Sequence, residues 1–155
     1  MVSFYLAETD HDYAAARSLF EAYANSININ LDFQHFDDEL DGLKKMYAKP
    51  VGGIILAKNE EDSMIGCVAI RRVNDATGEL KRMYIQPGNQ NKGIGKKLLE
   101  KAFELARSCN YKIIKLDTLN TMLPAIHLYK NAGFYETPAY YYNPVPGAIY
   151  FEKVL

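Results

Sequence analysis

The segment QNKGIGKK, residues 90–97, holds two glycines and three lysines at a point where a loop gives way to a helical pattern. The first N–H groups of a helix have no intrahelical partner and carry partial positive charge. Gly93 and Gly95 would leave the backbone there open to a ligand. The lysines, Lys92 and Lys96 among them, add positive charge. The segment therefore predicts a site for a phosphate group, with a ligand-free helix entry as the alternative.

Two familiar phosphate loops do not match this segment. A Walker loop requires GxxxxGK[ST], and the chain contains no such string. A dinucleotide-binding fingerprint requires GxGxxG, but Leu98 occupies the place of the third glycine. The pattern that remains is Gln90-x-x-Gly93-x-Gly95, and it follows a strand pattern over residues 79–85.

A second block that could carry chemistry is AIHLYKNAGF, residues 125–134. It lies on a predicted helix that Thr121 can cap and Gly133 can end. Tyr129 in this block carries a phenol, which stays protonated at neutral pH because its reference pKa is near 10 and which could donate a proton. In a chain with 12 tyrosines, however, a packing residue on an amphipathic helix is the ordinary interpretation.

Together the two blocks resemble the GCN5-related N-acetyltransferase (GNAT) superfamily. The signature Q/R-x-x-G-x-G/A matches Gln90, Gly93 and Gly95, and A-x-x-L-Y-x-x-x-G-F matches residues 125–134. The resemblance covers nearly the whole chain. It implies one α/β domain over residues 1–155, with a mixed, mostly antiparallel sheet flanked by helices. It also implies an enzyme that moves acetyl from acetyl-CoA to a primary amine.

The resemblance further implies a coenzyme A site without a metal. Backbone N–H groups of residues 90–96 would hold the pyrophosphate, and the main chain of residues 83–85 would pair with the pantetheine arm. Met122 stands where many members carry an asparagine, so Asn120 is the nearest candidate for that contact. The coenzyme-binding residues predicted in this way are Met83, Tyr84, Ile85, Gln90, Asn91, Lys92, Gly93, Ile94, Gly95, Lys96, Asn120, Ala125 and Leu128.

The implied reaction is direct attack by the amine in a ternary complex. Tyr129 would protonate the coenzyme A thiolate, and Glu79 is the candidate base for the ammonium group. An exposed glutamate at a strand end is the alternative for Glu79. Cys67 and Cys109 lie outside both motifs, so we expect buried, reduced thiols and no covalent enzyme intermediate. Two rivals stay open: a coenzyme A-binding sensor that needs neither Tyr129 nor Glu79, and transfer of a longer acyl group.

Hydrophobic periodicity predicts the element order β-α-α-β-β-β-α-β-α-β. Asp10 would cap the first helix. Residues 27–34 alternate apolar and polar side chains, so they are either extended or a structured loop. The predicted strands are 3–8, 54–58, 64–73, 79–85, 112–119 and 148–155, and the predicted helices are 10–23, 36–47, 94–108 and 121–133.

The composition of the 155 residues is that of a globular protein, with 48% hydrophobic and 24% charged residues. The chain contains no apolar run of the roughly 18 residues that a membrane span needs, and its first residues do not resemble a signal peptide. We therefore expect a cytoplasmic protein. The three histidines do not cluster with the cysteines in the sequence, so we expect no metal site.

Charge is divided unevenly along the chain, although the net charge is only −1. Residues 1–75 hold 13 acidic and 7 basic side chains, and residues 76–155 hold 6 acidic and 11 basic ones. The small net charge argues against nucleic-acid binding. The expected partner is a small-molecule or peptide amine, whose identity the sequence leaves open. Residues 30–41 and 140–147 are candidates for the walls of its site. A homodimer is also left open.

Overall fold

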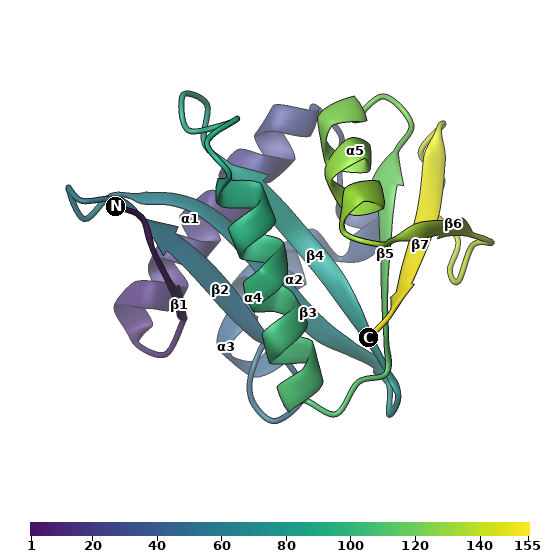
Figure 1. The fold of residues 1–155 in the computed structure, drawn as a ribbon, viewed down its shortest axis with the longest axis horizontal. Helices are drawn as coiled ribbons and strands as arrows, with labels where there is room; N and C mark the ends of the chain where they lie inside the picture. The colour runs from purple at the N-terminus through teal and green to yellow at the C-terminus, as the bar shows by residue number, and fades with distance from the viewer.

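The computed structural model describes residues 1–155, apart from the side chain of Phe33. Seven strands form one mixed sheet in the order β1-β2-β3-β4-β5-β7-β6 (Figure 1). Neighbouring strands are antiparallel except for β4 and β5, which confirms the predicted fold class. The strands are β1 (Ser3–Leu6), β2 (Gly53–Lys58), β3 (Met64–Asn74), β4 (Thr77–Ile85), β5 (Ile113–Leu119), β6 (Tyr135–Thr137) and β7 (Ala148–Val154).

Helices cover both faces of the sheet, with α4 in front of it and α1 behind it in Figure 1. Each face has its own apolar cluster, one under α1–α3 and one under α4 and α5. None of the helices formed by the described residues is both long and apolar enough to cross a bilayer. The helices are α1 (Asp10–Ile27), the 3-10 helix η1 (Asp32–Gln34), α2 (Phe36–Asp41), α3 (Leu43–Met46), α4 (Ile94–Ser108) and α5 (Leu123–Asn131).

The helix predicted over residues 94–108 is confirmed, because its apolar positions recur on one face and are buried against the sheet. The predicted caps are wrong. Thr9 rather than Asp10 caps α1, through a capping box in which the Thr9 hydroxyl accepts from the Asp12 N–H at 3.1 Å. Met122 rather than Thr121 precedes α5, and its side chain makes no capping hydrogen bond.

Three other predictions change. Residues 27–34 are not a strand, since α1 continues to Ile27 and η1 follows. The alternative prediction of a structured loop is therefore right. The side chain of Phe33 lies outside the described part of this segment. Asn28 turns the chain at a φ of 51°, a left-handed conformation that asparagine tolerates. The helix predicted over residues 36–47 is interrupted at Gly42. The short strand β6 was not predicted, and it forms only by pairing with β7.

The strands β4 and β5 pair over three residues and then separate. Their parallel pairing ends at Glu79 and Lys115. Beyond that point β4 contains a bulge, because Arg82 and Met83 lie opposite Val68 alone. Arg82 has a φ of 57°, which is unusual for a residue with a side chain. The separation of the two strands is visible in Figure 1 as a wedge that opens toward α5.

A buried ion pair holds the bulge. Arg82 donates from Nη2 to Glu39 Oε1 at 2.7 Å and from Nε to Glu39 Oε2 at 2.9 Å. The Tyr47 hydroxyl donates to the same carboxylate at 2.9 Å. Burial by itself raises the pKa of Glu39, but the hydrogen bonds and the positive charge of Arg82 outweigh it, so this pKa lies below its ordinary value. The pair therefore ties α2 to β4 where β4 leaves β5.

We predict that Glu39→Gln lowers the free energy of unfolding at neutral pH by about 3–5 kcal/mol, because Arg82 is left buried without a counter-charge. Because the pKa of Glu39 is lower in the folded than in the unfolded protein, its carboxylate stabilises the folded wild type at pH values above the ordinary pKa of glutamate. That contribution is lost as the pH falls through the folded pKa, so the difference between the proteins shrinks in acid. Urea denaturation at pH 7 and pH 3 measures both effects.

Asp38→Asn is the matched control, because Asp38 lies beside Glu39 on α2 but is exposed. It should leave the unfolding free energy nearly unchanged. Equal stability of Glu39→Gln and the wild type at pH 7 would contradict the role assigned to the pair.

Candidate functional site

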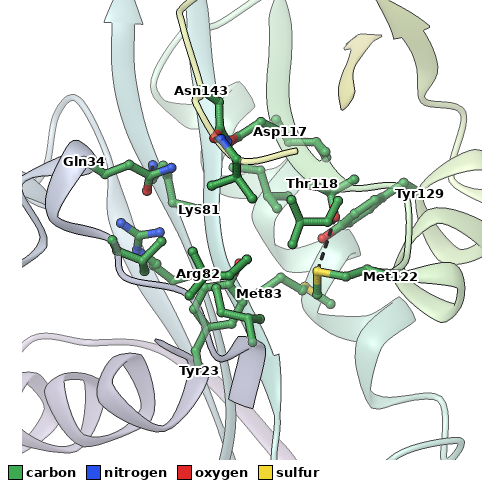
Figure 2. A pocket seen from close by; sticks show the side chains of 18 residues that line it. Tyr23, Gln34, Lys81, Arg82, Met83, Asp117, Thr118, Met122, Tyr129 and Asn143 are labelled. Atoms are coloured by element: carbon green, nitrogen blue, oxygen red, sulfur yellow. Dashed lines mark hydrogen bonds between the residues drawn. The ribbon is translucent and has the colours of Figure 1, made fainter. Parts of the chain in front are cut away.

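A pocket occupies the wedge between β4 and β5. Its walls come from α1 and the loop after it, from β4 and β5, from the start of α5, and from the loop before β7. Polar side chains lie on opposite sides of this pocket, with Lys81 and Gln34 facing the side that holds Thr118 and Tyr129 (Figure 2). The pocket thus brings together two regions that were predicted from the sequence to be functional, the block on α5 and the segment after α1.

Tyr129 lies on the buried side of α5 and lines the pocket. Its ring packs edge-on against Phe134, with the centroids 5.7 Å apart. The described side chains offer its hydroxyl no hydrogen bond, and they include no fully buried polar atom that lacks a partner, so this hydroxyl keeps access to the pocket. Burial raises the pKa of Tyr129, with the neighbouring Tyr23 and Asp117 adding to the effect. The phenol therefore stays protonated and can donate.

Glu79 lies deep in the sheet rather than in the pocket wall. Its side chain is only 2% exposed. One carboxylate oxygen accepts from Arg71 Nε at 2.8 Å, and the other accepts from the Tyr140 hydroxyl. Glu79 is not among the residues that line the pocket. The structure thus brings Tyr129 to the pocket, whereas Glu79 is buried outside the pocket wall and bonded to two partners.

The loop before α4 presents unpaired backbone donors. Gly93 is the N-cap of α4, and no side chain caps this helix. Within the described part of the chain, the N–H groups of residues 90–96 make no hydrogen bond. Lys92 and Lys96 are exposed beside them. Free N–H groups, a helix N-terminus and two cations fit an anionic group such as a pyrophosphate.

The two glycines of the motif have different roles. Gly93 has a φ of 78°, and a Cβ added there would meet nothing within 4 Å. Gly95 is buried, and a Cβ added there would lie 3.0 Å from Leu128 Cδ2 and 3.3 Å from Ile85 Cδ1. Gly93 is thus required by backbone conformation, and Gly95 by the close packing of α4 against α5 and β4.

The other predicted coenzyme-binding residues differ in where they lie relative to the pocket. Met83 and Ala125 line the pocket, and the Gln90 side chain donates to the carbonyl oxygen of the last residue of β4 at 3.4 Å. Asn120 does not line the pocket, and its side chain packs against Gly147 instead. The remaining members lie on β4 or in the loop and first turn of α4; these are Tyr84, Ile85, Asn91, Lys92, Ile94 and Lys96.

Several polar side chains that the sequence analysis missed line the pocket, with Lys81 and Gln34 across from Tyr129 and Asp117 on the side of Thr118 (Figure 2). Lys81 Nζ donates to Gln34 Oε1 at 3.2 Å. Asp117 Oδ2 accepts from Asn143 Nδ2 at 2.8 Å and from the Tyr141 hydroxyl. The available signal was a charged residue inside an apolar strand, since such residues are rarely buried without a reason. Gln34 and Asn143 lie within the two segments predicted as acceptor walls.

The cysteines are both free. Cys67 is buried as expected, and its thiol donates to the Arg82 carbonyl at 3.2 Å. Cys109 is only partly buried, so the expectation that both thiols are buried is wrong for this residue. The described residues include no group of three or more His, Cys, Asp or Glu side chains arranged to hold a metal ion.

Comparison with known proteins identifies the family. Residues 13–134 match the model of the acetyltransferase (GNAT) family. An uncharacterized N-acetyltransferase of Schizosaccharomyces pombe is 34% identical over 137 residues, which cover 88% of this chain and 84% of the relative. The chain therefore belongs to the GNAT acetyltransferase family, and it is an acetyltransferase.

Solved structures agree with this fold. A GNAT-family acetyltransferase from Staphylococcus aureus superposes with a TM-score of 0.82 at 22% identity, over 99% of each chain. A GNAT-family acetyltransferase from Elizabethkingia anophelis, solved with acetyl-CoA bound, superposes with a TM-score of 0.66 at 20% identity, over 99% of this chain and 98% of that one.

We predict that Gly93→Ala lowers the free energy of unfolding by roughly 1–2 kcal/mol, the cost of a left-handed conformation for a residue with a Cβ. The new methyl group has open space, so no clash adds to this cost. Gly88→Ala is the matched control, because Gly88 has a φ of 90° and equally open surroundings. Thermal and urea unfolding should give similar losses for the two variants, and the absence of a loss in Gly93→Ala would refute the conformational role.

Proposed function

We propose that this protein is an acetyl-CoA-dependent N-acetyltransferase that acts on a primary amine. The observation that carries the proposal is the wedge between β4 and β5, which leaves one edge of β4 unpaired from Leu80 onward. That edge leads directly into the loop whose N–H groups are free, and Tyr129 faces the same pocket from α5. A donor laid along β4 would thus have its anionic end at α4 and its acyl end beside Tyr129.

The donor supplies an activated acetyl thioester, and the chain's own groups would hold it. The N–H groups of residues 90–96 would bind the pyrophosphate, with Lys92 and Lys96 adding charge. The main chain of Met83, Tyr84 and Ile85 would pair with the pantetheine arm in the manner of an added strand. Ala125 and Leu128 would form the apolar wall on α5, and Asn120 remains a predicted contact.

Tyr129 is the proposed general acid. When the amine nitrogen bonds to the thioester carbonyl carbon, the C–S bond breaks and the sulfur leaves as a thiolate. The Tyr129 hydroxyl, which its raised pKa keeps protonated, would give this thiolate a proton. The second proton that the attacking nitrogen loses would restore the phenol. The overall reaction converts an ammonium group and a thioester into an amide, a thiol and one released proton.

The base that first removes the ammonium proton is proposed to be a carboxylate. Glu79 is the residue predicted from the sequence, and it would act through a water molecule, since it is not part of the pocket wall. Asp117 is the second candidate, because its carboxylate lines the pocket itself. The two candidates differ in a measurable way.

We predict that the wild type releases free thiol from acetyl-CoA in the presence of an accepting amine, and that Tyr129→Phe lowers kcat by about a hundredfold or more. Affinity for coenzyme A should change little, because the phenol acts only when the thiolate forms. Thiol detection across an amine panel and calorimetric titration with coenzyme A measure the two quantities. Unchanged turnover in Tyr129→Phe would retire the acid role.

The same experiment separates the enzyme from a sensor. A sensor would bind coenzyme A without releasing thiol in the presence of any amine in the panel. It would also retain its affinity in Tyr129→Phe. Thiol release with any amine rules out this alternative.

We predict that Glu79→Gln loses the acid limb of the pH–rate profile if Glu79 is the base, because a protonated carboxylate cannot accept a proton and glutamine has no such titration. Arg71→Gln is the matched control, since it breaks the same ion pair and keeps the carboxylate. Asp117→Asn tests the other candidate. An intact acid limb in Glu79→Gln, with its loss in Asp117→Asn, would move the role to Asp117.

A further inference from the structure

The pocket contains two opposite charges, on Lys81 and Asp117, that are joined only through neutral groups, because Gln34 accepts from Lys81 and donates to the Tyr141 hydroxyl at 2.9 Å, which in turn donates to Asp117. Of the charged residues that line it, Arg82 is paired with Glu39. Lys81 and Asp117 also line the pocket, and neither forms an ion pair within the described part of the chain. Burying a charge without a counter-charge is costly, and proteins rarely retain it without a purpose. This cost applies to Lys81, which is buried, whereas Asp117 is only partly buried and offers the pocket a negative charge. A ligand that carries both signs of charge would pair with both side chains.

Lys81 gives the stronger reason to expect a charged ligand. Its residue is only 5% exposed, and its hydrogen-bond partner, Gln34, is neutral. Burial lowers the pKa of Lys81, and Arg82 and Arg71 oppose the help that it receives from Glu79 and Asp117. A ligand carboxylate beside Nζ would supply the missing charge and a hydrogen-bond acceptor, and its effect would favour the ammonium form.

Asp117 is suited to an ammonium group. Its Oδ2 accepts from two neutral donors, Tyr141 and Asn143, which orient the carboxylate without cancelling its charge. Lys81 lies across the pocket from it, on β4 rather than β5 (Figure 2).

We propose that the acetyl acceptor is a small amine that also carries a carboxylate, as an amino acid does, with its carboxylate bound by Lys81 and Gln34 and its ammonium group by Asp117. This inference rests on the proposed N-acetyltransferase function and narrows its substrate class. Asp117 lies on the side of the pocket that holds Thr118 and Tyr129 (Figure 2), so an ammonium group bound to it would be on that side. Apolar residues from the loop after α1 and the loop before β7, such as Ile29, Leu31 and Val145, would contact the body of the acceptor.

The test compares acceptors that differ only in the carboxylate. Thiol release from acetyl-CoA is measured with the twenty standard amino acids, β-alanine and 4-aminobutyrate, and with the amide and the decarboxylated amine of each accepted compound. We expect kcat/KM for the carboxylate form to exceed that of its amide and its amine by about tenfold or more, since a charge-assisted hydrogen bond contributes roughly 1.5–3 kcal/mol.

Substitutions at Lys81 assign the effect. Lys81→Met should remove the preference, by raising KM for carboxylate acceptors at least tenfold more than it raises KM for carboxylate-free amines. Lys81→Arg keeps the charge and should retain part of the preference. Lys115→Met is the matched control, because Lys115 lies on the neighbouring strand but does not line the pocket. Coenzyme A affinity and thermal unfolding of each variant establish that it is folded and binds the donor.

Each outcome decides a different point. Thiol release without preference for the carboxylate, or a preference that survives in Lys81→Met, overturns the acceptor class and leaves the acetyltransferase standing. Equal loss for acceptors with and without a carboxylate in Lys81→Met would reduce Lys81 to a structural residue and also overturn the inference. An absence of thiol release with every compound would count against both the acceptor class and the proposed function.

Discussion

The site depends on one feature of the sheet, the early end of the pairing between β4 and β5. Three residue pairs join these strands, and the bulge at Arg82 then carries β4 away. The bidentate pair between Arg82 and Glu39 holds that bulge in the interior, where losing either partner would strand a charge. The unpaired edge of β4, the pocket and the route to α4 all follow from this local geometry.

The bulge also explains how neighbouring residues of β4 face both sides of the sheet. After Lys81 and Arg82, which face the side of α1 and α2, Met83 turns to the side of α4 and α5. The proposed donor region on one face and the proposed acceptor region on the other would therefore meet at consecutive residues. In the proposed ternary complex, the acetyl group would have only this short distance to cross.

Local signals in the sequence were the most reliable. The period of apolar residues predicted α4 to its observed ends, and the left-handed Gly93 lies at its start. Predictions were wrong where tertiary contacts compete with local preference. The alternation after Ile27 suggested a strand, but left-handed Asn28 turns the chain and no neighbouring strand was available to pair with it. The strand β6 escaped prediction for the opposite reason, since β7 supplies its hydrogen bonds.

By itself the sequence determined the two motifs, the family resemblance that they carry and the helix entry at Gly93, and the resemblance implied the mixed sheet and a candidate role for Tyr129. Each motif is formed by residues that are close together in the chain. Tertiary structure alone decided that Lys81 and Asp117 face one pocket, that Gly95 serves packing, and that Glu79 is buried against Arg71 outside the pocket wall. The physical reason is that burial and charge pairing depend on which strands become neighbours, and a linear pattern does not specify the residues that a strand will meet.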